Sequence, residues 1–325
     1  MPVQNRTLAG TDLSVGRIVF GAMTFGVQVD EAEAADMVRT CRDAGVTMFD
    51  TSNNYAGGAS EEILGRIIKP FRDDVVISTK GGSHVDQLDP SLAGLSRRAL
   101  HQAVNGSLKR LGTDHIDVYY LHRPDRQTPI EETLQALDEI VRAGKVRYVA
   151  QSNYAAWQVA DMVRRAQCHG WPQVLISQSL YNMVSRRVEA EYAEFSKDFG
   201  ITNITYNPLA GGLLTGKHKF EDKSGAGTRF SKPIYRDRYW NKAQFEAVDR
   251  LGEIAAQAGL TLIELAYRWV LGRELTDCML LGASSQAQLK ANLTALDGPP
   301  LDPDTLAACD DVWSGLAGAA PAYNR

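Results

Sequence analysis

The sequence predicts an α/β fold, and within that class a single (β/α)8 (TIM) barrel. Three observations lead to this prediction. Short apolar runs alternate with helical patterns along the 325 residues, and together they make eight strand–helix pairs. The strands are continuous apolar runs rather than alternating ones, as expected of parallel strands that are covered on both faces. Eight such repeats fit a closed parallel barrel better than an open sheet.

The predicted elements follow one another closely along the chain, beginning with a hairpin-like stretch at residues 4–16. The predicted strands are residues 17–23, 46–50, 75–80, 115–122, 146–152, 174–178, 201–208 and 278–282. The predicted helices are residues 31–44, 60–69, 96–111, 130–143, one opened by Asn153 and Tyr154, 186–199, 242–258, 261–272 and 285–296. Gly45 and Gly112 follow two of these helices, as is typical of helix C-termini. No Gly/Ser-rich or Pro-rich linker divides the chain, so we expect one domain over residues 1–325.

Two segments exceed a minimal barrel. Residues 209–240, after the seventh predicted strand, are too long and polar for a short strand-to-helix connection, and loops of this length are usually functional or disordered. Residues 301–325 are expected to form an extra C-terminal helix that ends in PAYNR. Active sites of (β/α)8 barrels lie at the C-terminal ends of the strands, so both segments are expected to be able to reach the site.

Composition and charge exclude several classes of function. The formal net charge of −4 and the absence of a Lys/Arg run argue against nucleic-acid binding. The first ten residues lack the apolar core of a signal peptide, and no window approaches the roughly 18 apolar residues that span a bilayer. Four cysteines without C-x-x-C spacing and six scattered histidines do not indicate disulfides or a metal site. We therefore expect a cytoplasmic, metal-free protein that does not bind membranes.

Polar residues at the ends of apolar strands indicate where chemistry occurs. Asp50, Lys80 and His122 end the second, third and fourth predicted strands. An unpaired buried ammonium group is costly, so Lys80 requires a carboxylate, which Asp50 on the neighbouring strand can supply. A buried ion pair without a catalytic role is the alternative interpretation of these two residues.

Tyr55 lies five residues after Asp50, in the loop that follows the second predicted strand. A phenol titrates near 10, and a nearby cation lowers that pKa. Tyr55 beside Lys80 is therefore predicted to act as a general acid. His122 alone is more typical of a satisfied barrel histidine, but beside Tyr55 its imidazole could hydrogen-bond a substrate carbonyl.

These strand ends belong to longer motifs, and the sequence resembles the aldo-keto reductases along nearly its whole length. The matching motifs are FDTSNNYAGGASEEILG, VVISTKGG, YYLHRPD, SNY and LGASSQAQLKANL. Within that family it is most similar to the aflatoxin-aldehyde and succinic-semialdehyde reductase branch, through SNYAAWQVA, YNPLAGGLLTGKHKFEDKSG, YRDRYWNKAQFEAV and the terminal YNR.

The resemblance implies reduction of aldehydes or ketones by hydride transfer from NADPH. Tyr55 would protonate the nascent alkoxide, Lys80 would lower the pKa of Tyr55, and Asp50 would hold Lys80. His122 would orient the carbonyl group of the small-molecule substrate. The resemblance also suggests a homodimer.

The resemblance further implies a cofactor site. Its carboxamide end would be held by Ser152, Asn153 and Gln178, with Tyr206 stacked on the nicotinamide. Residues 207–217 would cover the pyrophosphate, and backbone N–H groups at the start of the last barrel helix suit an anionic 2′-phosphate. The predicted cofactor residues are Met23, Ser152, Asn153, Gln178, Tyr206, Asn207, Pro208, Leu209, Gly211, Leu213, Lys217, Arg229, Gly282, Ser284, Gln288 and Asn292. Because residues 285 and 286 are Ser and Gln, the cation beside the 2′-phosphate is expected to be Arg229 or Lys290.

Substrate selection is expected to lie in the long loop and the tail. Tyr235, Arg238 and Arg325 match residues that contact acidic or polar substrates in the resembled branch. An Arg can pair with a carboxylate through two hydrogen bonds, so aldehydes that carry a carboxylate or a second carbonyl group are expected to be favoured. A solvated surface charge is the alternative for both arginines. Ala56 follows Tyr55 where many family members have Gly, which puts the substrate range in doubt.

Two other functions remain open. A cofactor-binding regulatory or auxiliary subunit with weak reductase activity is one, because the family includes ion-channel subunits of that kind, although no partner-binding stripe supports it. A barrel lyase or isomerase is disfavoured by the lack of metal-ligand patterns and phosphate-binding glycines. No G-x-G-x-x-G lies in a strand-to-helix turn, so a dinucleotide site here would not be of the Rossmann type.

Overall fold

Within residues 5–83, 93–222 and 228–319, which the computed structural model describes, eight parallel strands close into a barrel. Strand β10 pairs with both β3 and β9, so the first and last barrel strands are neighbours and the ring has no edge. The strands are β3 (Ile18–Gly21), β4 (Met48–Asp50), β5 (Val76–Gly81), β6 (Ile116–Leu121), β7 (Val146–Ser152), β8 (Ile176–Leu180), β9 (Thr202–Tyr206) and β10 (Cys278–Gly282). The predicted (β/α)8 barrel is confirmed.

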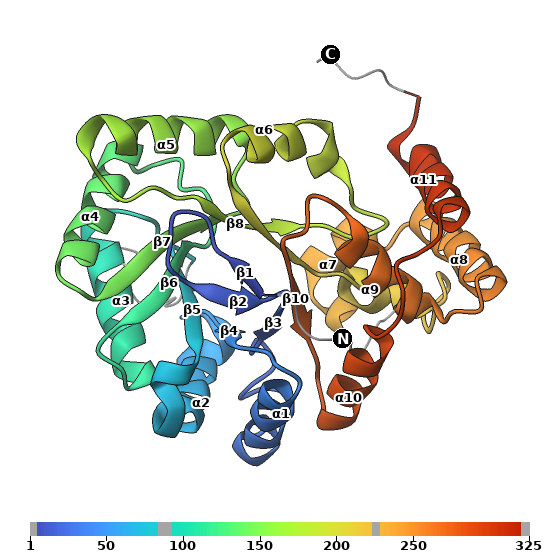
Figure 1. The fold of residues 1–325 in the computed structure, drawn as a ribbon, viewed down its shortest axis with the longest axis horizontal. Helices are drawn as coiled ribbons and strands as arrows, with labels where there is room; N and C mark the ends of the chain where they lie inside the picture. The colour runs from blue at the N-terminus through green and yellow to red at the C-terminus, as the bar shows by residue number, and fades with distance from the viewer. Residues whose placement is uncertain (1–4, 84–92, 223–227, 320–325) are drawn as a thin grey trace.

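Helices surround the barrel (Figure 1). They are α1 (Glu31–Asp43), α2 (Ala59–Ile68), α3 (Arg97–Leu111), α4 (Ile130–Arg142), α5 (Ala156–His169), α6 (Tyr192–Asp198), α8 (Lys242–Gln257), α9 (Leu262–Gly272) and α10 (Gln286–Ala295). Several begin at a side chain that accepts a hydrogen bond from the first turn; Thr261 does so and forms a capping box with Glu264. No helix in the described part of the chain has the length and hydrophobicity needed to cross a bilayer.

A hairpin closes the N-terminal mouth of the barrel. It consists of β1 (Asn5–Thr7) and β2 (Ser14–Gly16), which pair antiparallel as the sequence predicts. Leu8 and Leu13 in the turn between them pack with side chains of the barrel interior, such as Val118. A larger apolar layer fills the space between the strands and the helices. The open mouth is therefore the one at the C-terminal ends of the strands.

Two helix predictions need correction. Residues 186–199 form a short 3-10 turn at Arg187–Ala190 and then α6, rather than one helix. The guanidinium of Arg186 binds Glu189 and also Asp310 of the C-terminal helix, which draws this segment away from a helical path. The helix expected from Asn153 onward begins at Ala156, because Asn153 has a φ of 65°.

Both extra segments contain helical elements in their described residues. Residues 209–240 contain 3-10 turns at Ala210–Thr215 and Arg229–Ser231, followed by helix α7 (Pro233–Tyr239). Pro233 opens α7, where its fixed φ favours a helix start. The C-terminal helix α11 (Pro303–Ala317) packs against α8. The predicted extra helix after residue 301 is thereby confirmed.

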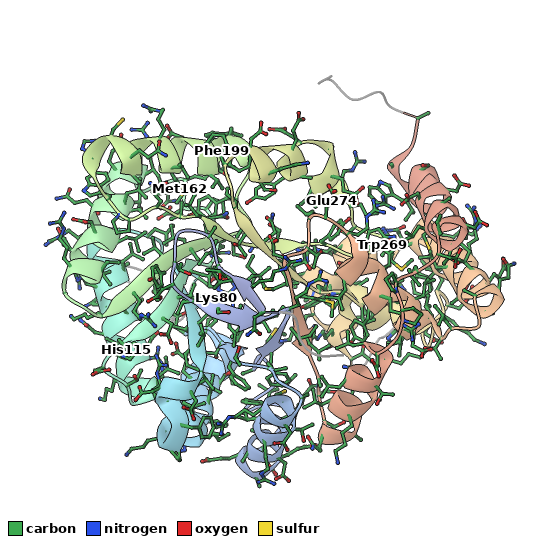
Figure 2. The ribbon with its side chains drawn as sticks, viewed as in Figure 1. Lys80, His115, Met162, Phe199, Trp269 and Glu274 are labelled. Atoms are coloured by element: carbon green, nitrogen blue, oxygen red, sulfur yellow. The ribbon has the colours of Figure 1, made fainter. Side chains whose placement is uncertain are left out.

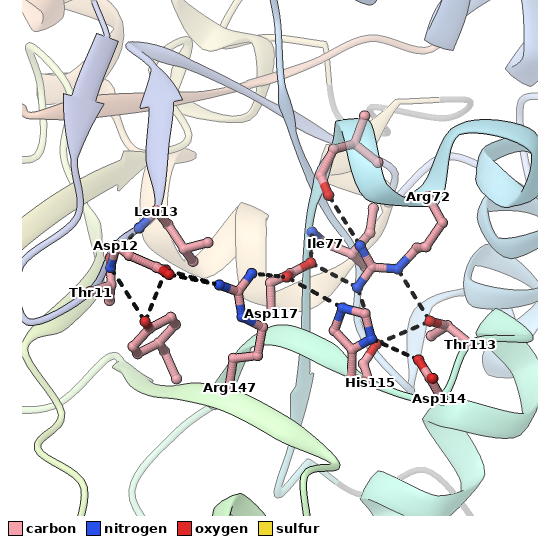
Figure 3. A network of polar contacts seen from close by, with 12 residues as sticks. Thr11, Asp12, Leu13, Arg72, Ile77, Thr113, Asp114, His115, Asp117 and Arg147 are labelled. Atoms are coloured by element: carbon pink, nitrogen blue, oxygen red, sulfur yellow. Dashed lines mark hydrogen bonds and ion pairs between the residues drawn. The ribbon is translucent and has the colours of Figure 1, made fainter.

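A polar network ties the hairpin to the N-terminal mouth, and the buried carboxylate of Asp117 lies at its centre (Figure 3). Its Oδ2 accepts hydrogen bonds from the Ile77 backbone at 2.9 Å and forms an ion pair with Arg72 at 2.8 Å. Its Oδ1 accepts from Arg147 at 2.9 Å, and Arg147 also donates to Asp12 in the hairpin turn. Strands β5, β6 and β7 and the hairpin are thus joined through one buried carboxylate.

Replacing Asp117 with Ala is expected to lower the free energy of unfolding by about 3 kcal/mol, because two arginines lose a buried partner. Urea denaturation measures this loss. The matched control is Asp12→Ala, whose carboxylate is 70 % exposed and whose loss should cost no more than about 1 kcal/mol. Equal losses in both variants would contradict the central role of Asp117. Activity should be retained in the folded protein, since the network lies at the end of the barrel away from Lys80.

Candidate active site

The register of the barrel sets the C-terminal ends of β4, β5 and β6 side by side. Asp50, the last residue of β4, lies opposite Ser78 of β5, so Lys80 lies two residues further toward the open mouth. Gly81 lies opposite Leu121, and His122 follows directly after β6. Figure 2 shows Lys80 near the middle of the molecule, among the strands. Three residues that are far apart in sequence thus meet at one mouth.

Asp50 and Lys80 form a fully buried ion pair. The Lys80 ammonium contacts Oδ1 of Asp50 and donates to the Thr51 carbonyl at 2.8 Å. Oδ2 of Asp50 accepts from the Ser78 hydroxyl at 2.7 Å and from the Gln178 amide at 3.1 Å. Burial is the largest single influence and lowers the pKa of Lys80, but the charges and hydrogen bonds of Asp50 and Tyr55 together outweigh it, and the net direction is upward. Lys80 is therefore an ammonium ion at neutral pH.

Tyr55 begins a 3-10 turn after β4 and lies above this pair. The Lys80 ammonium is 5.1 Å from the centre of the Tyr55 ring. Burial raises the pKa of Tyr55 above its usual value, and the positive charge of Lys80 opposes that rise only in part. The expected lowering by Lys80 is present, but desolvation of the phenol outweighs it, so the net shift is upward. The sequence does not reveal this burial. Tyr55 is therefore a neutral phenol at pH 7.

His122 faces Tyr55, with ring centres 6.0 Å apart in an edge-to-face arrangement. Its Nδ1 lies 3.2 Å from the hydroxyl oxygen of Ser52. Burial, together with the charges of Lys80 and Arg123, lowers the pKa of His122 to about 3. The imidazole is therefore neutral at pH 7, and one of its two nitrogens carries a hydrogen.

The residues predicted to hold a carboxamide lie next to this cluster. Ser152 is opposite Gln178 in the β7–β8 register, and its hydroxyl donates to the Gln178 carbonyl at 2.8 Å. The Asn153 amide donates to the His122 carbonyl at 2.9 Å, and the Tyr206 hydroxyl donates to Asn153 Oδ1 at 2.7 Å. Four predicted cofactor residues and the predicted catalytic histidine thus form one connected group.

A second group gathers at the end of β10. The amide of Asn292 donates to the Gly282 carbonyl at 3.2 Å, and Gln288 Oε1 accepts from both the backbone and the hydroxyl of Ser284. The guanidinium of Arg229, from the long loop, lies 3.5 Å from the position that a Cβ at Gly282 would occupy. Arg229 is therefore close to Gly282 although 53 residues separate the two in sequence.

The segment after β9 joins the two groups. Asn207 has a φ of 65°, and its side chain accepts from the Gly211 backbone at 2.6 Å. A Cβ at Gly211 would lie 3.0 Å from the Tyr235 ring, so a glycine lets α7 approach this turn closely. The side chain of Leu213 packs in the core, which leaves only its backbone for contact with a ligand.

The remaining predicted binding residues differ in exposure. Met23 and Leu209 are half-buried and Pro208 is buried, whereas Lys217 and Lys290 are exposed. Of the predicted substrate residues, Arg238 has its guanidinium 6.0 Å from the centre of the Tyr239 ring, and its charge opposes the rise that burial causes in the pKa of Tyr206. Arg325 lies outside the described residues.

Sequence reasoning missed two serines of this site. Ser78 precedes Lys80 by two residues on one strand, so the two share a face, and strand periodicity could have identified it. Ser52 lies in a loop, which has no such period, and only the fold brings it to His122.

The arrangement fits a nicotinamide dinucleotide. Amide and hydroxyl groups at the β7 and β8 ends can pair with a carboxamide, and the half-exposed Tyr206 ring can cover a flat heterocycle. At the other end, Gly282 leaves room beside Arg229, whose guanidinium suits a phosphate.

Comparison with known proteins gives a consistent result. The sequence model of the family described as "Aldo/keto reductase family" matches residues 17–314. The mouse protein "Aflatoxin B1 aldehyde reductase member 2" is 35% identical, over 100% of this chain and 91% of its own length. The human "Aldo-keto reductase family 7 member A3" is 35% identical, over 94% and 96%. A rice (Oryza sativa subsp. japonica) protein described as "Probable voltage-gated potassium channel subunit beta" is also 35% identical, over 92% and 93%.

Proposed function

The chain belongs to the aldo/keto reductase family, whose oxidoreductases use NAD(P)H, and we propose that it reduces aldehydes and ketones to alcohols with NADPH and with Tyr55 as the proton donor. The observation that carries this proposal is the cluster of Tyr55, Lys80 and Asp50 at the C-terminal mouth of the barrel. Enzymes of this fold carry their active sites at that mouth.

Each residue of the cluster has a role that follows from its charge. A nicotinamide cofactor, when bound, would supply the hydride. Tyr55, a neutral phenol at pH 7, donates its proton to the carbonyl oxygen as negative charge develops there. Lys80 stabilises the phenolate that remains, and Asp50 holds Lys80 in place. Neutral His122 offers a hydrogen bond that orients the carbonyl oxygen and stabilises its developing charge.

The purified protein should consume NADPH, followed by its near-ultraviolet absorbance, when aldehydes are added. The panel should include a neutral aldehyde, an aldehyde that carries a carboxylate, and a dicarbonyl compound. An absence of turnover with all of them, despite measurable NADPH binding, would contradict the proposal.

That outcome would favour a second candidate, a cofactor-binding auxiliary subunit with weak reductase activity. Its support is the similarity to plant proteins described as probable potassium channel subunits, from rice and Arabidopsis thaliana. Turnover at ordinary enzymatic rates would argue against it, since an auxiliary role requires cofactor binding but not catalysis.

Arg229 is proposed to select NADPH over NADH through the 2′-phosphate. Arg229→Ala is then expected to weaken NADPH binding by about 10- to 100-fold, the size of one charged hydrogen bond, with little effect on NADH. Fluorescence titration with each cofactor measures the two dissociation constants. Lys290→Ala is the matched control, because Lys290 is the other candidate cation. If Arg229 is the selecting residue, Lys290→Ala should leave both dissociation constants nearly unchanged. Equal weakening of both cofactors by Arg229→Ala would rule out selection by this residue.

Arg238 and Arg325 are proposed to favour substrates that carry a carboxylate. Replacing either with Ala should raise KM for a carboxylated aldehyde by about 10-fold or more, while KM for a neutral aldehyde of similar size changes little. The charge of Arg238 also acts on Tyr206, a predicted cofactor residue, so the NADPH dissociation constant must be measured in that variant as well. Equal increases in KM for both aldehydes would exclude a role in carboxylate recognition.

A further inference from the structure

The buried hydroxyl of Ser52 lies between two side chains at the candidate active site. Its oxygen is 3.2 Å from Nδ1 of His122 and 2.8 Å from Oδ1 of Asn54, and the Lys80 carbonyl lies at 3.5 Å. The mechanism proposed above uses His122 but assigns no role to Ser52 or Asn54.

Backbone hydrogen bonds hold the turn that carries Ser52 and Asn54. The Asn53 backbone donates to the Lys80 carbonyl at 3.2 Å, and the Tyr55 backbone donates to the Ser52 carbonyl at 3.1 Å. Ser52 is fully buried and Asn54 is half-buried. The contact between Ser52 and His122 is therefore set by the same turn that positions Tyr55.

The contact between Ser52 and His122 determines which nitrogen of the imidazole carries the hydrogen. A neutral imidazole has one N–H group and one bare nitrogen, and the serine hydroxyl has one hydrogen to donate. If Ser52 donates to Asn54 Oδ1, Nδ1 of His122 must carry the hydrogen and donate to Ser52. Nε2 is then bare and can only accept a hydrogen bond.

The hydrogen bonds among Asn54, Ser52 and His122 can also run in the opposite direction without moving these residues. The Asn54 carboxamide can present its NH2 group in place of its oxygen by rotating about its last side-chain bond. The amide then donates to Ser52, Ser52 donates to Nδ1, and the hydrogen of His122 lies on Nε2. Only this form offers an N–H group from Nε2 to a carbonyl oxygen.

We propose that Ser52 and Asn54 are positioning residues that set the tautomer of His122: the Asn54 amide donates to Ser52, Ser52 donates to Nδ1, and Nε2 keeps the hydrogen that it offers to the substrate carbonyl. This inference rests on the proposed reductase function, in which His122 is such a donor.

Two substitutions of Asn54 separate the alternatives. In Asn54→Asp the carboxylate can only accept, so it keeps the Ser52 hydrogen and forces the hydrogen of His122 onto Nδ1. The value of kcat/KM should fall by about 100-fold, as when a donor to a developing oxyanion is lost. In Asn54→Ala neither arrangement is enforced, so the two tautomers of His122 mix, and kcat/KM should fall only a few-fold, far less than in Asn54→Asp.

A second pair of variants removes the effect of the added charge. If the carboxylate acts through Ser52, Asn54→Asp should cause no further loss in a Ser52→Ala background. The same 100-fold loss in both backgrounds would show that charge alone is responsible, and would overturn the proposal.

Nitrogen-15 NMR of histidine-labelled protein, without cofactor, reads the tautomer directly. The His122 signals are identified by their absence in His122→Gln. Asn54→Asp should shift His122 toward the Nδ1–H form relative to the unmodified protein and Asn54→Ala, and Ser52→Ala should abolish this shift. An unchanged tautomer in Asn54→Asp would overturn the inference. If no carbonyl compound is reduced by the unmodified protein, the reductase proposal fails, while the tautomer measurement remains a separate result.

Discussion

Replacing Tyr55 with Phe is expected to lower kcat for carbonyl reduction by about 10²- to 10⁴-fold, the usual contribution of a positioned general acid. The phenol is the neutral donor next to Lys80, and Phe keeps the ring while removing its proton. The dissociation constant of NADPH should change little, because the ring still fills the same space. Stopped-flow single turnovers and fluorescence titration measure the two quantities.

The pH dependence of the reaction follows from the same residue. Reduction needs protonated Tyr55, which is the form present below its pKa. Since burial raises this pKa above its ordinary value near 10, kcat should be flat from neutral to mildly alkaline pH and fall only as the pH rises through the Tyr55 pKa. His122 should add no change near neutrality, because its pKa of about 3 keeps it neutral there.

Tyr119→Phe is a matched control for the loss of a buried phenol, since Tyr119 packs in the layer between the barrel and the helices. It should retain kcat. Wild-type turnover in Tyr55→Phe, or an equal loss in Tyr119→Phe, would show that Tyr55 is not the proton donor.

Replacing Lys80 with Met is expected to reduce both activity and stability. Removing one partner of a buried ion pair leaves the Asp50 carboxylate unpaired, which costs about 3–5 kcal/mol of unfolding free energy. The phenolate formed on Tyr55 also loses its neighbouring cation, so kcat should fall by at least about 100-fold. Urea denaturation and steady-state kinetics measure the two losses.

A double variant separates these two effects. In Lys80→Met with Asp50→Leu the buried charge is gone, and most of the lost stability should return, since apolar replacements of a buried pair are often neutral. Activity should stay low, because Tyr55 still lacks its cation. Restored turnover in the double variant would mean that the pair is only structural, the alternative that the sequence leaves open.

Much of the fold could be predicted because each barrel strand is an apolar run of its own. The prediction for Cys278–Gly282 agrees with the structure at both ends. Local sequence failed at residues 186–199, where the break depends on Arg186 reaching Asp310, which is 124 residues away in sequence. Helical periodicity does not contain such a distant contact.

Some features of the candidate site could likewise be predicted from the sequence, and others could not. Asp50, Lys80 and His122 could be found from sequence because a polar residue at the end of an apolar strand is unusual. The bond from Gln178 to Asp50 could not, because it joins β8 to β4 across the barrel mouth. The net upward shift of the Tyr55 pKa also depends on burial, which no single residue reveals.

The pairing of β10 with β3 has a consequence for how the protein is made. One edge of β3 has no partner until the last strand has been synthesised. Arg17, next to β3, likewise lacks a partner until much of the chain has been made: its guanidinium donates to the Leu271 carbonyl, 254 residues further along, at 2.7 Å. The ring can therefore close only late in synthesis of the chain, and unfinished chains expose a strand edge that can pair with other chains.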